Sequence, residues 1–120
     1  FSPPGITVAV AKDRAIESFM QVNKTFVINI LREDNFQKMF RHFLKRFAPG
    51  ADRFADVDII EDLAKGGPVL SEALAFLDCK VISRLETPDH WIIYGIVENG
   101  SVSDLTCKTA VHHRKVANHY

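Results

Sequence analysis

The densest hydrophobic run in the chain is Thr25-Phe-Val-Ile-Asn-Ile-Leu31, and its β-branched and aromatic residues predict a strand. Apolar side chains alternate to both faces of this strand, which predicts that both faces are buried. The exception is Asn29, whose amide needs hydrogen-bond partners because an unpaired buried amide costs roughly 1–3 kcal/mol. Two hypotheses follow: Asn29 bonds a neighbouring loop, or it faces a polar ligand. The strand alone favours the loop.

Shorter patterns precede this strand. The apolar run over residues 6–11 predicts another strand, which follows the extended Pro3-Pro4 pair and stops at Lys12-Asp13. Asp13 is a candidate N-cap for a short helix that ends near Asn23. One face of that helix is predicted to hold Ile16, Phe19 and Met20.

A longer helix is predicted from Asp34 as its N-cap to Pro49-Gly50 as its stop, with Gln37 in a variant of the capping box. Its apolar stripe is typical of core packing and comprises Phe36, Met39, Phe40, Phe43, Leu44 and Phe47. The opposite side is basic and comprises Lys38, Arg41, His42, Lys45 and Arg46. Such a side is usually solvated, but Lys and Arg also donate charge-assisted hydrogen bonds to a phosphate or an acidic partner.

The second half of the chain predicts mainly strands. Residues 51–67 predict loop and short helix, with a turn at Gly66-Gly67-Pro68. Alternation over 73–85 predicts a half-exposed antiparallel strand with Asp78, Lys80 and Arg84 on its polar side. A strand over 90–97, a hairpin turn at 98–101 and a returning strand over 102–111 complete the pattern.

Short strands joined by hairpins predict a mostly β fold with inserted helices. The 120 residues are enough for one domain, and the expected architecture is a small antiparallel barrel over residues 1–120. Net charge is zero, so no overall field favours nucleic acid or an anionic membrane. No apolar run reaches membrane-spanning length. We expect a fragment of a longer polypeptide, because the chain begins at Phe1 without Met.

Few motifs point to a particular chemistry. The two common phosphate-binding glycine loops are absent, as are the GxSxG and HExxH motifs. The histidines and cysteines match no standard zinc spacing, so no metal site is predicted. Cys79 and Cys107 lack CxxC spacing, and free buried cysteines are the expectation in a reduced, cytoplasmic setting. Asp89-His90 lies at a predicted hairpin, where loops can present functional groups.

The order of several short motifs resembles the flavin reductase-like family, which has an FMN-binding antiparallel split β-barrel. The motifs are Ser2-Pro3-Pro4, the run Phe26–Leu31, Gly67–Leu70, and Asp89-His90 followed by Ile92–Val97. Phe47–Phe54, Thr109–Lys115 and the end Asn118-His119-Tyr120 are similar to the C-terminal domain of cyanobacterial flavodiiron (diflavin) proteins. The resemblance covers nearly the whole chain.

The resemblance implies a homodimer of split barrels with FMN near the dimer interface, reduced by NADH or NADPH. It also implies preceding diiron and flavodoxin-like modules, which together with this domain would reduce oxygen to water. Motif by motif, the implied cofactor-binding residues are Ser2, Pro3, Pro4, Asn29, Ile30, Leu31, Phe47, Arg53 and Phe54. The nicotinamide side would be bordered by His90, His112, Arg114 and Tyr120, with His90 as an orienting candidate.

One departure from the family pattern is the absence of the strand, rich in Ser and Thr, that precedes the Pro-Pro pair. Its loss would expose a sheet edge and weaken FMN binding. Two alternatives to an NAD(P)H-dependent flavin reductase therefore stay open. One is a flavin-binding or docking module without hydride chemistry, and the other is a structural dimerisation domain. A pocket that joins Asn29, Arg53 and His90 would distinguish the enzyme from both.

Overall fold

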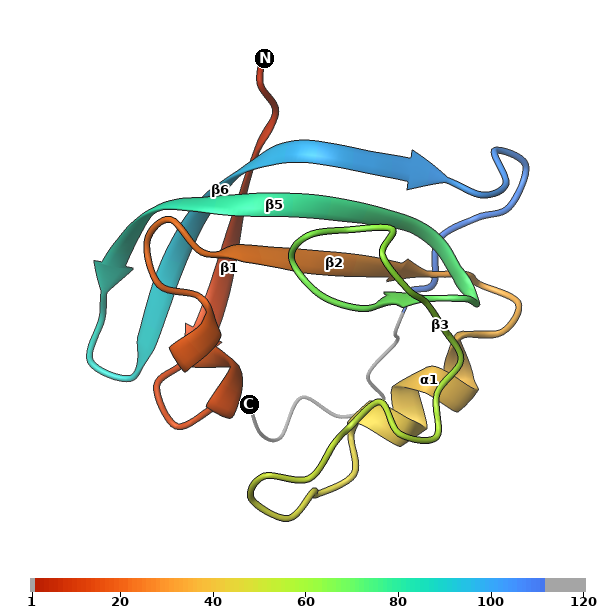
Figure 1. Ribbon diagram of the computed structural model, residues 1–120, viewed down its shortest axis with the longest axis horizontal. Coiled ribbons are helices and arrows are strands. Elements are labelled where there is room, and N and C mark those ends of the chain that lie inside the picture. Colours follow the sequence, from red (N-terminus) through yellow and green to blue (C-terminus); the bar gives the residue numbers. More distant parts are fainter. Residues whose placement is uncertain (1, 112–120) are drawn as a thin grey trace.

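The computed structural model describes residues 2–111 and shows a curled, four-stranded antiparallel sheet (Figure 1). The order of its strands is β1-β6-β5-β2. Their bounds are Gly5–Ala11 for β1, Thr25–Leu31 for β2, Ala73–Glu86 for β5 and His90–Val102 for β6. The sheet forms half of a barrel, which confirms the predicted mostly β, antiparallel architecture.

The remaining elements are short and lie between these strands. A 3₁₀ helix, η1, covers Ala15–Phe19, and the α-helix α1 covers Phe36–Phe43. Strands β3 (Ile59–Ile60) and β4 (Val69–Leu70) form a separate two-stranded antiparallel sheet. None of the helices within residues 2–111 is long and apolar enough to cross a membrane.

The concave side of the sheet carries the main hydrophobic core. Val81, Cys79 and Ile93 are fully buried there, and Phe26 from β2 packs with them. A second, smaller core lies under α1, where Met39, Leu70 and Ala73 are buried. Both faces of β2 are therefore covered, as its apolar pattern predicts.

The structure corrects the prediction of a hairpin turn at 98–101. β6 instead runs on to Val102, and Leu77 of β5 faces Gly100 within the ladder. Asn99-Gly100 does not form the predicted turn, because both residues continue to pair with the long strand β5. A Cβ at Gly100 would lie 2.7 Å from the carbonyl oxygen of Phe76, so glycine allows this close approach. The predicted return strand over 102–111 reduces, within the described residues, to one bridge between Thr109 and Arg32.

The predicted helices are also shorter than expected. α1 ends at Phe43, so Phe47 lies in the following loop. Asn35, not Asp34, occupies the N-cap position, and its side chain makes no capping hydrogen bond. Asp34 is instead paired with Arg32, whose Nε lies 3.1 Å from Oδ1. This ion pair holds the pKa of Asp34 below its ordinary value.

The short helix over Ala15–Phe19 leaves most of its apolar face in solvent. Of the three predicted face residues, Met20 is buried, but Ile16 and Phe19 are 54% and 71% exposed. Arg14 occupies the N-cap position, so the predicted cap at Asp13 is wrong. The helix ends at Phe19 with Met20 as its C-cap, so Asn23 is not its stop; Asn23, with a φ of 69°, lies in the turn before β2. Residues 51–67 contain β3 and turns, but no helix.

Candidate functional site

The side chain of Asn29 holds the loop that connects β3 to β4 in place. Its Nδ2 donates to the carbonyl of Pro68 at 3.1 Å, and its Oδ1 accepts from the N–H of Leu70 at 2.8 Å. Both polar atoms of the amide are therefore used by the protein itself. Of the two sequence hypotheses for Asn29, the structure shows the loop-bonding one.

The buried carboxylate of Asp78 holds the same loop. Asp78 lies on β5, two residues beyond Phe76, the partner of Asn29. Asp78 is only 5% exposed, and its two oxygens accept the backbone N–H groups of Lys65 at 2.7 Å and Gly66 at 3.0 Å. The sequence predicts Asp78 on an exposed polar side, and this prediction is wrong. The residue does lie on the outer face of β5, but the loop crosses over it. A Cβ at Gly66 would lie 2.5 Å from the backbone of Phe26, so only glycine allows this approach.

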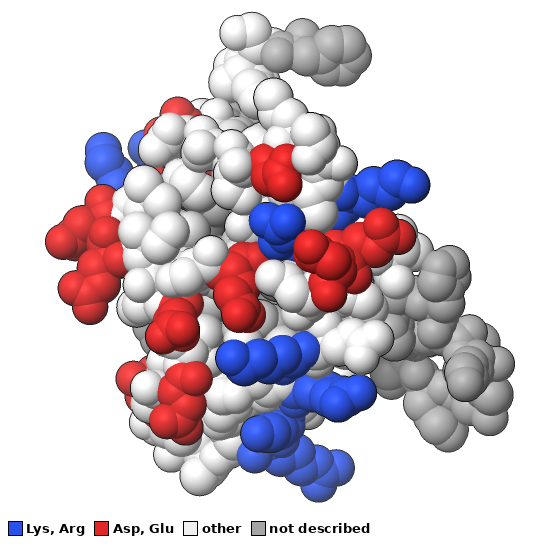
Figure 2. Space-filling view, turned by 90° about the vertical axis from the view of Figure 1, so that its right-hand side faces the viewer, with Lys and Arg blue, Asp and Glu red and all other residues white. Residues whose placement is uncertain are grey.

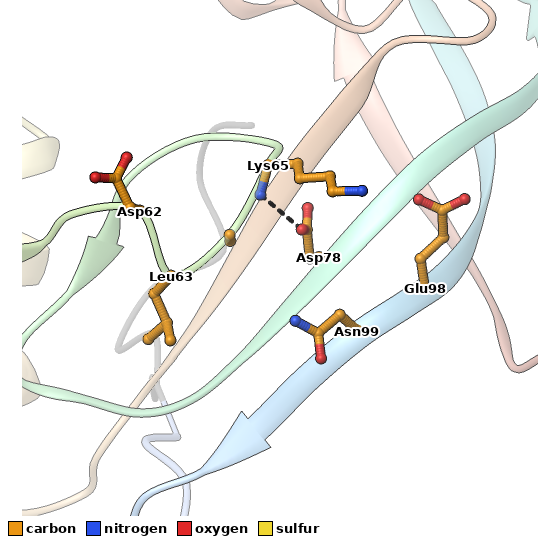
Figure 3. Close-up of a pocket in the computed structure, with 7 residues that line it drawn as sticks. Asp62, Leu63, Lys65, Asp78, Glu98 and Asn99 are labelled. Carbon is orange, nitrogen blue, oxygen red and sulfur yellow. Dashed lines mark hydrogen bonds between the residues drawn. The ribbon is translucent and has the colours of Figure 1, made fainter.

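A surface cavity of about 670 Å³ opens beside Asp78 (Figure 3). The loop lines one side of it, and β6 contributes Glu98 and Asn99 on the other. Its volume is in the range of small-ligand sites. Its walls are mostly polar and acidic, because Asp62, Asp78 and Glu98 outnumber Lys65.

The segment after α1 holds an aromatic and basic cluster. The Arg53 guanidinium lies 5.4 Å from the Phe47 ring centroid, and His42 Nε2 lies 2.8 Å from the Arg53 carbonyl oxygen. Phe54 packs against Phe43 with their centroids 5.2 Å apart. Three of the sequence-predicted site residues, Phe47, Arg53 and Phe54, therefore lie together, with Phe54 turned toward the second core.

Two further groups of predicted site residues lie on other parts of the half-barrel. Ser2, Pro3 and Pro4 are exposed, and the Pro4 carbonyl accepts the N–H of Val97. His90 begins β6, and its Nδ1 lies 2.9 Å from the Asp89 carboxylate. The hydrogen bond from His90 holds the pKa of Asp89 below its ordinary value. His112, Arg114 and Tyr120 lie outside the described residues.

A single chain does not bring Asn29 and His90 together. Asn29 is opposite Phe76, and Phe76 is opposite Ser101, so Asn29 is level with the end of β6. His90 starts that strand eleven residues earlier, roughly 35 Å along an extended chain. Neither Arg53 nor His90 lines the cavity beside Asp78. The pocket expected to join Asn29, Arg53 and His90 is therefore not formed within one chain.

Sequence reasoning also missed a cluster at the end of the barrel near η1. A bulge in β5 between Val81 and Ser83 turns Arg84 inward, where only 7% of its side chain is exposed. Its guanidinium pairs with Glu17 and lies 4.1 Å from the ring centroid of Trp91. The predicted exposure of Arg84 is therefore wrong. The alternation of apolar and polar residues along the strand does not show where a bulge occurs, so this contact could not be predicted from the sequence.

Comparison with protein families gives a match that spans almost the entire chain. The model of the flavin reductase like domain matches residues 1–118. The chain belongs to the flavin reductase-like domain family. Its sheet agrees with that assignment, because its structural neighbours have the split-barrel fold of flavin reductases.

The chain is similar in sequence to cyanobacterial diflavin flavoproteins. The chain is 60% identical over its full length to Diflavin flavoprotein A 1 of a Synechocystis species, and 57% identical over 98% of its length to a putative diflavin flavoprotein A 1 of Thermosynechococcus vestitus. It spans only 21% and 20% of those two proteins. The flavin reductase-like domain thus corresponds to about one fifth of the length of these two proteins.

Among solved structures, the chain is similar to the NADH:FAD oxidoreductase SgcE6 of Streptomyces globisporus C-1027. The TM-score is 0.78 at 29% identity, and the match covers 90% of this chain and 63% of that one. A putative oxidoreductase of Sinorhizobium meliloti matches with a TM-score of 0.71 at 32% identity, over 89% of this chain and 36% of that one. The family and its oxidoreductase neighbours support a flavin-binding oxidoreductase domain.

Proposed function

We propose that this domain binds FMN and passes electrons to it from NADH or NADPH. The observation that carries the proposal is the fold likeness to an NADH:FAD oxidoreductase over 90% of the chain. When bound, the flavin would supply the redox chemistry, so the protein has to bind it, orient the nicotinamide beside it and exclude water. No acid or base is required of the protein if the two rings stack with reacting atoms about 3–3.5 Å apart.

The described residues fit a flavin in part. β2 has only one strand neighbour in the sheet, β5, but the Leu31 carbonyl on its other edge already accepts the N–H of Ala110. The edge that could offer backbone donors and acceptors to the polar side of the flavin ring therefore lies before Leu31, at Asn29. The Arg53 guanidinium is exposed and forms no ion pair within residues 2–111, which suits a phosphate or the ribityl chain. Asn29 contributes its backbone only, because its side chain already bonds the loop.

The separation of His90 from Asn29 indicates how the site would be completed. We propose that a homodimer brings His90 of one copy toward the flavin held by the other, with Ser2, Pro3 and Pro4 lining the ring. His112, Arg114 and Tyr120 would border the nicotinamide side. His90 would act as a positioning residue for the nicotinamide, and its contact with Asp89 would orient its ring.

A second candidate function is a flavin-binding or dimerisation module without hydride chemistry of its own. The observation that favours it is the same separation, because one chain shows no pocket that joins Arg53, Asn29 and His90. In either case we propose that the domain is part of a longer diflavin protein. Preceding diiron and flavodoxin-like modules would use its electrons to reduce oxygen to water.

The experiment is anaerobic mixing of the FMN-loaded chain with NADH or with NADPH, monitored by the loss of the visible absorbance of oxidised flavin. A reductase bleaches with at least one of the two donors. Arg53→Gln should raise the FMN concentration needed, whereas the exposed control Lys24→Gln should not. A dimer that binds FMN but is bleached by neither donor would exclude the reductase and leave the second candidate.

A further inference from the structure

Positive charge is concentrated in one segment of a chain whose net charge is zero. Residues 36–53 contain five Lys and Arg residues but a single acid, Asp52, although the chain as a whole has 15 of each sign. We call four of these side chains the basic surface: Lys38, Arg41, Lys45 and Arg46. All four are exposed on α1 and on the three residues that follow it.

Lys38 shares a small cavity with Asp56, Asp58 and Glu72, so the uncompensated charges are those of Arg41, Lys45 and Arg46. None of the four forms an ion pair with any of residues 2–111. The nearby Asp52 carboxylate already accepts the N–H of Phe54 at 2.9 Å. Lys and Arg side chains gather at the lower edge of the face shown in Figure 2, at the height of α1 and its following loop. An uncompensated group of this kind gives a local potential of several kT.

The helix dipole accounts for only part of the pattern. Cations in the last turn of a helix are favourable, which suits Arg41. Lys45 and Arg46 lie beyond the last helical residue, Phe43. Lys38 and Arg41 are also three residues apart on α1, where like charges repel each other. Folding therefore gives no reason for all four charges.

Three kinds of anionic ligand could bind the basic surface: a phosphate, an anionic membrane or an acidic protein. The geometry favours the protein. Arg41, Lys45 and Arg46 line neither the cavity beside Asp78 nor the small cavity beside Lys38, so neither cavity is a phosphate site formed by these three cations. A membrane-surface helix needs a free apolar face, but α1 packs its apolar face, through Met39 and Phe43, against the second core. What the basic surface does expose is one apolar side chain, Leu44, 66% exposed among the cations. An apolar contact within a charged rim is typical of a protein–protein interface.

We propose that the basic surface docks the acidic face of a protein that exchanges electrons with this domain. The inference rests on the proposed function, because Arg53 and Phe47, which we assign to the flavin, lie just beyond the basic surface in the chain. A docked partner would lie close to the flavin. Charge-steered docking of this kind is fast and weak, which suits repeated electron transfer.

The test uses poly-L-glutamate as an acidic polypeptide probe and measures its binding to the chain at low and high salt. We expect binding near 10 mM salt, where the Debye length is about 30 Å, and its loss near 1 M, where it is about 3 Å. The double variant Lys45→Glu/Arg46→Glu should bind about tenfold more weakly or worse. The control Lys24→Glu/Lys108→Glu changes the net charge equally at two exposed sites and should bind much better than that variant.

Other outcomes overturn the proposal. Equal loss in both double variants would mean that binding follows net charge alone. Competition by inorganic pyrophosphate at similar concentration would indicate a phosphate site, and binding to phosphatidylserine vesicles without binding to poly-L-glutamate would indicate a membrane surface. FMN reduction by NADH or NADPH is measured on the same samples. It should be unchanged in Lys45→Glu/Arg46→Glu, so failure of the docking proposal is separable from failure of the proposed function.

Discussion

Asn29 allows the sharpest test of how the β3–β4 loop is held. Replacement by alanine removes two side-chain hydrogen bonds, one to the carbonyl of Pro68 and one from the N–H of Leu70. Each neutral hydrogen bond contributes about 0.5–1.5 kcal/mol, and a stranded buried donor costs about 1–3 kcal/mol. Leu70 is 5% exposed, so water cannot easily replace the lost acceptor. We expect Asn29→Ala to lower the free energy of unfolding by about 2–4 kcal/mol.

The assay is urea unfolding, followed by the fluorescence of Trp91, the single tryptophan. Thr25→Ala is a matched control on the same strand and the same loop. Its hydroxyl makes one long hydrogen bond, 3.4 Å to the Lys65 carbonyl, so its loss should cost only about 0.5 kcal/mol. FMN affinity, measured under folding conditions, should change little in either variant. A stable Asn29→Ala protein that no longer bound FMN would refute the reasoning and return the side chain to the ligand.

Three further predictions concern other contacts. Asp78→Asn should lower the free energy of unfolding by about 2–4 kcal/mol, because two backbone N–H groups lose a charged acceptor and meet an amide instead, and urea unfolding will measure this. The Arg84 guanidinium holds the pKa of Glu17 below its ordinary value of 4.5, so the stabilisation is present above that pH and is lost as the pH falls through the lower folded pKa. The melting temperatures of the wild type and Glu17→Gln should therefore differ near neutral pH and converge once the pH has fallen below the folded pKa of Glu17; a constant difference would contradict the ion pair. Gly66→Ala should be more damaging than Gly50→Ala. The added methyl group meets the Phe26 backbone at 2.5 Å at the first position and nothing within 4 Å at the second, although Gly50 has a φ of 77° that adds some strain. Parallel urea titrations compare the two.

The regular β pattern was the part of the fold that the sequence could predict. The run around Asn29 and the alternation over 73–85 match β2 and β5, because each packs its apolar side chains on the concave core. Local turn chemistry was less reliable. Asn99-Gly100 predicted a turn but lies within β6, because pairing along the whole of β5 stabilises the chain more than one favourable turn does.

The polar contacts within the fold could not be predicted, because they depend on segments far apart in sequence. Asp78 looks exposed until a loop thirteen residues earlier crosses over it, and Arg84 looks exposed until a bulge turns it inward. Phe47 and Arg53 are close in the chain, and the family resemblance, not a local pattern, named both as site residues. β6 begins at His90 as predicted, but the placement of His90 relative to Asn29 depends on how far β6 runs beside β5, which no local pattern predicts.

The central claim is that this chain holds a flavin. The most direct measurement is a titration of FMN into the folded chain, with its oligomeric state checked by light scattering, following the quenching of flavin fluorescence. The account predicts saturable binding of one FMN per chain by a dimer, weakened by Arg53→Gln and preserved in Lys24→Gln. A folded, dimeric chain that leaves flavin fluorescence unquenched would contradict it.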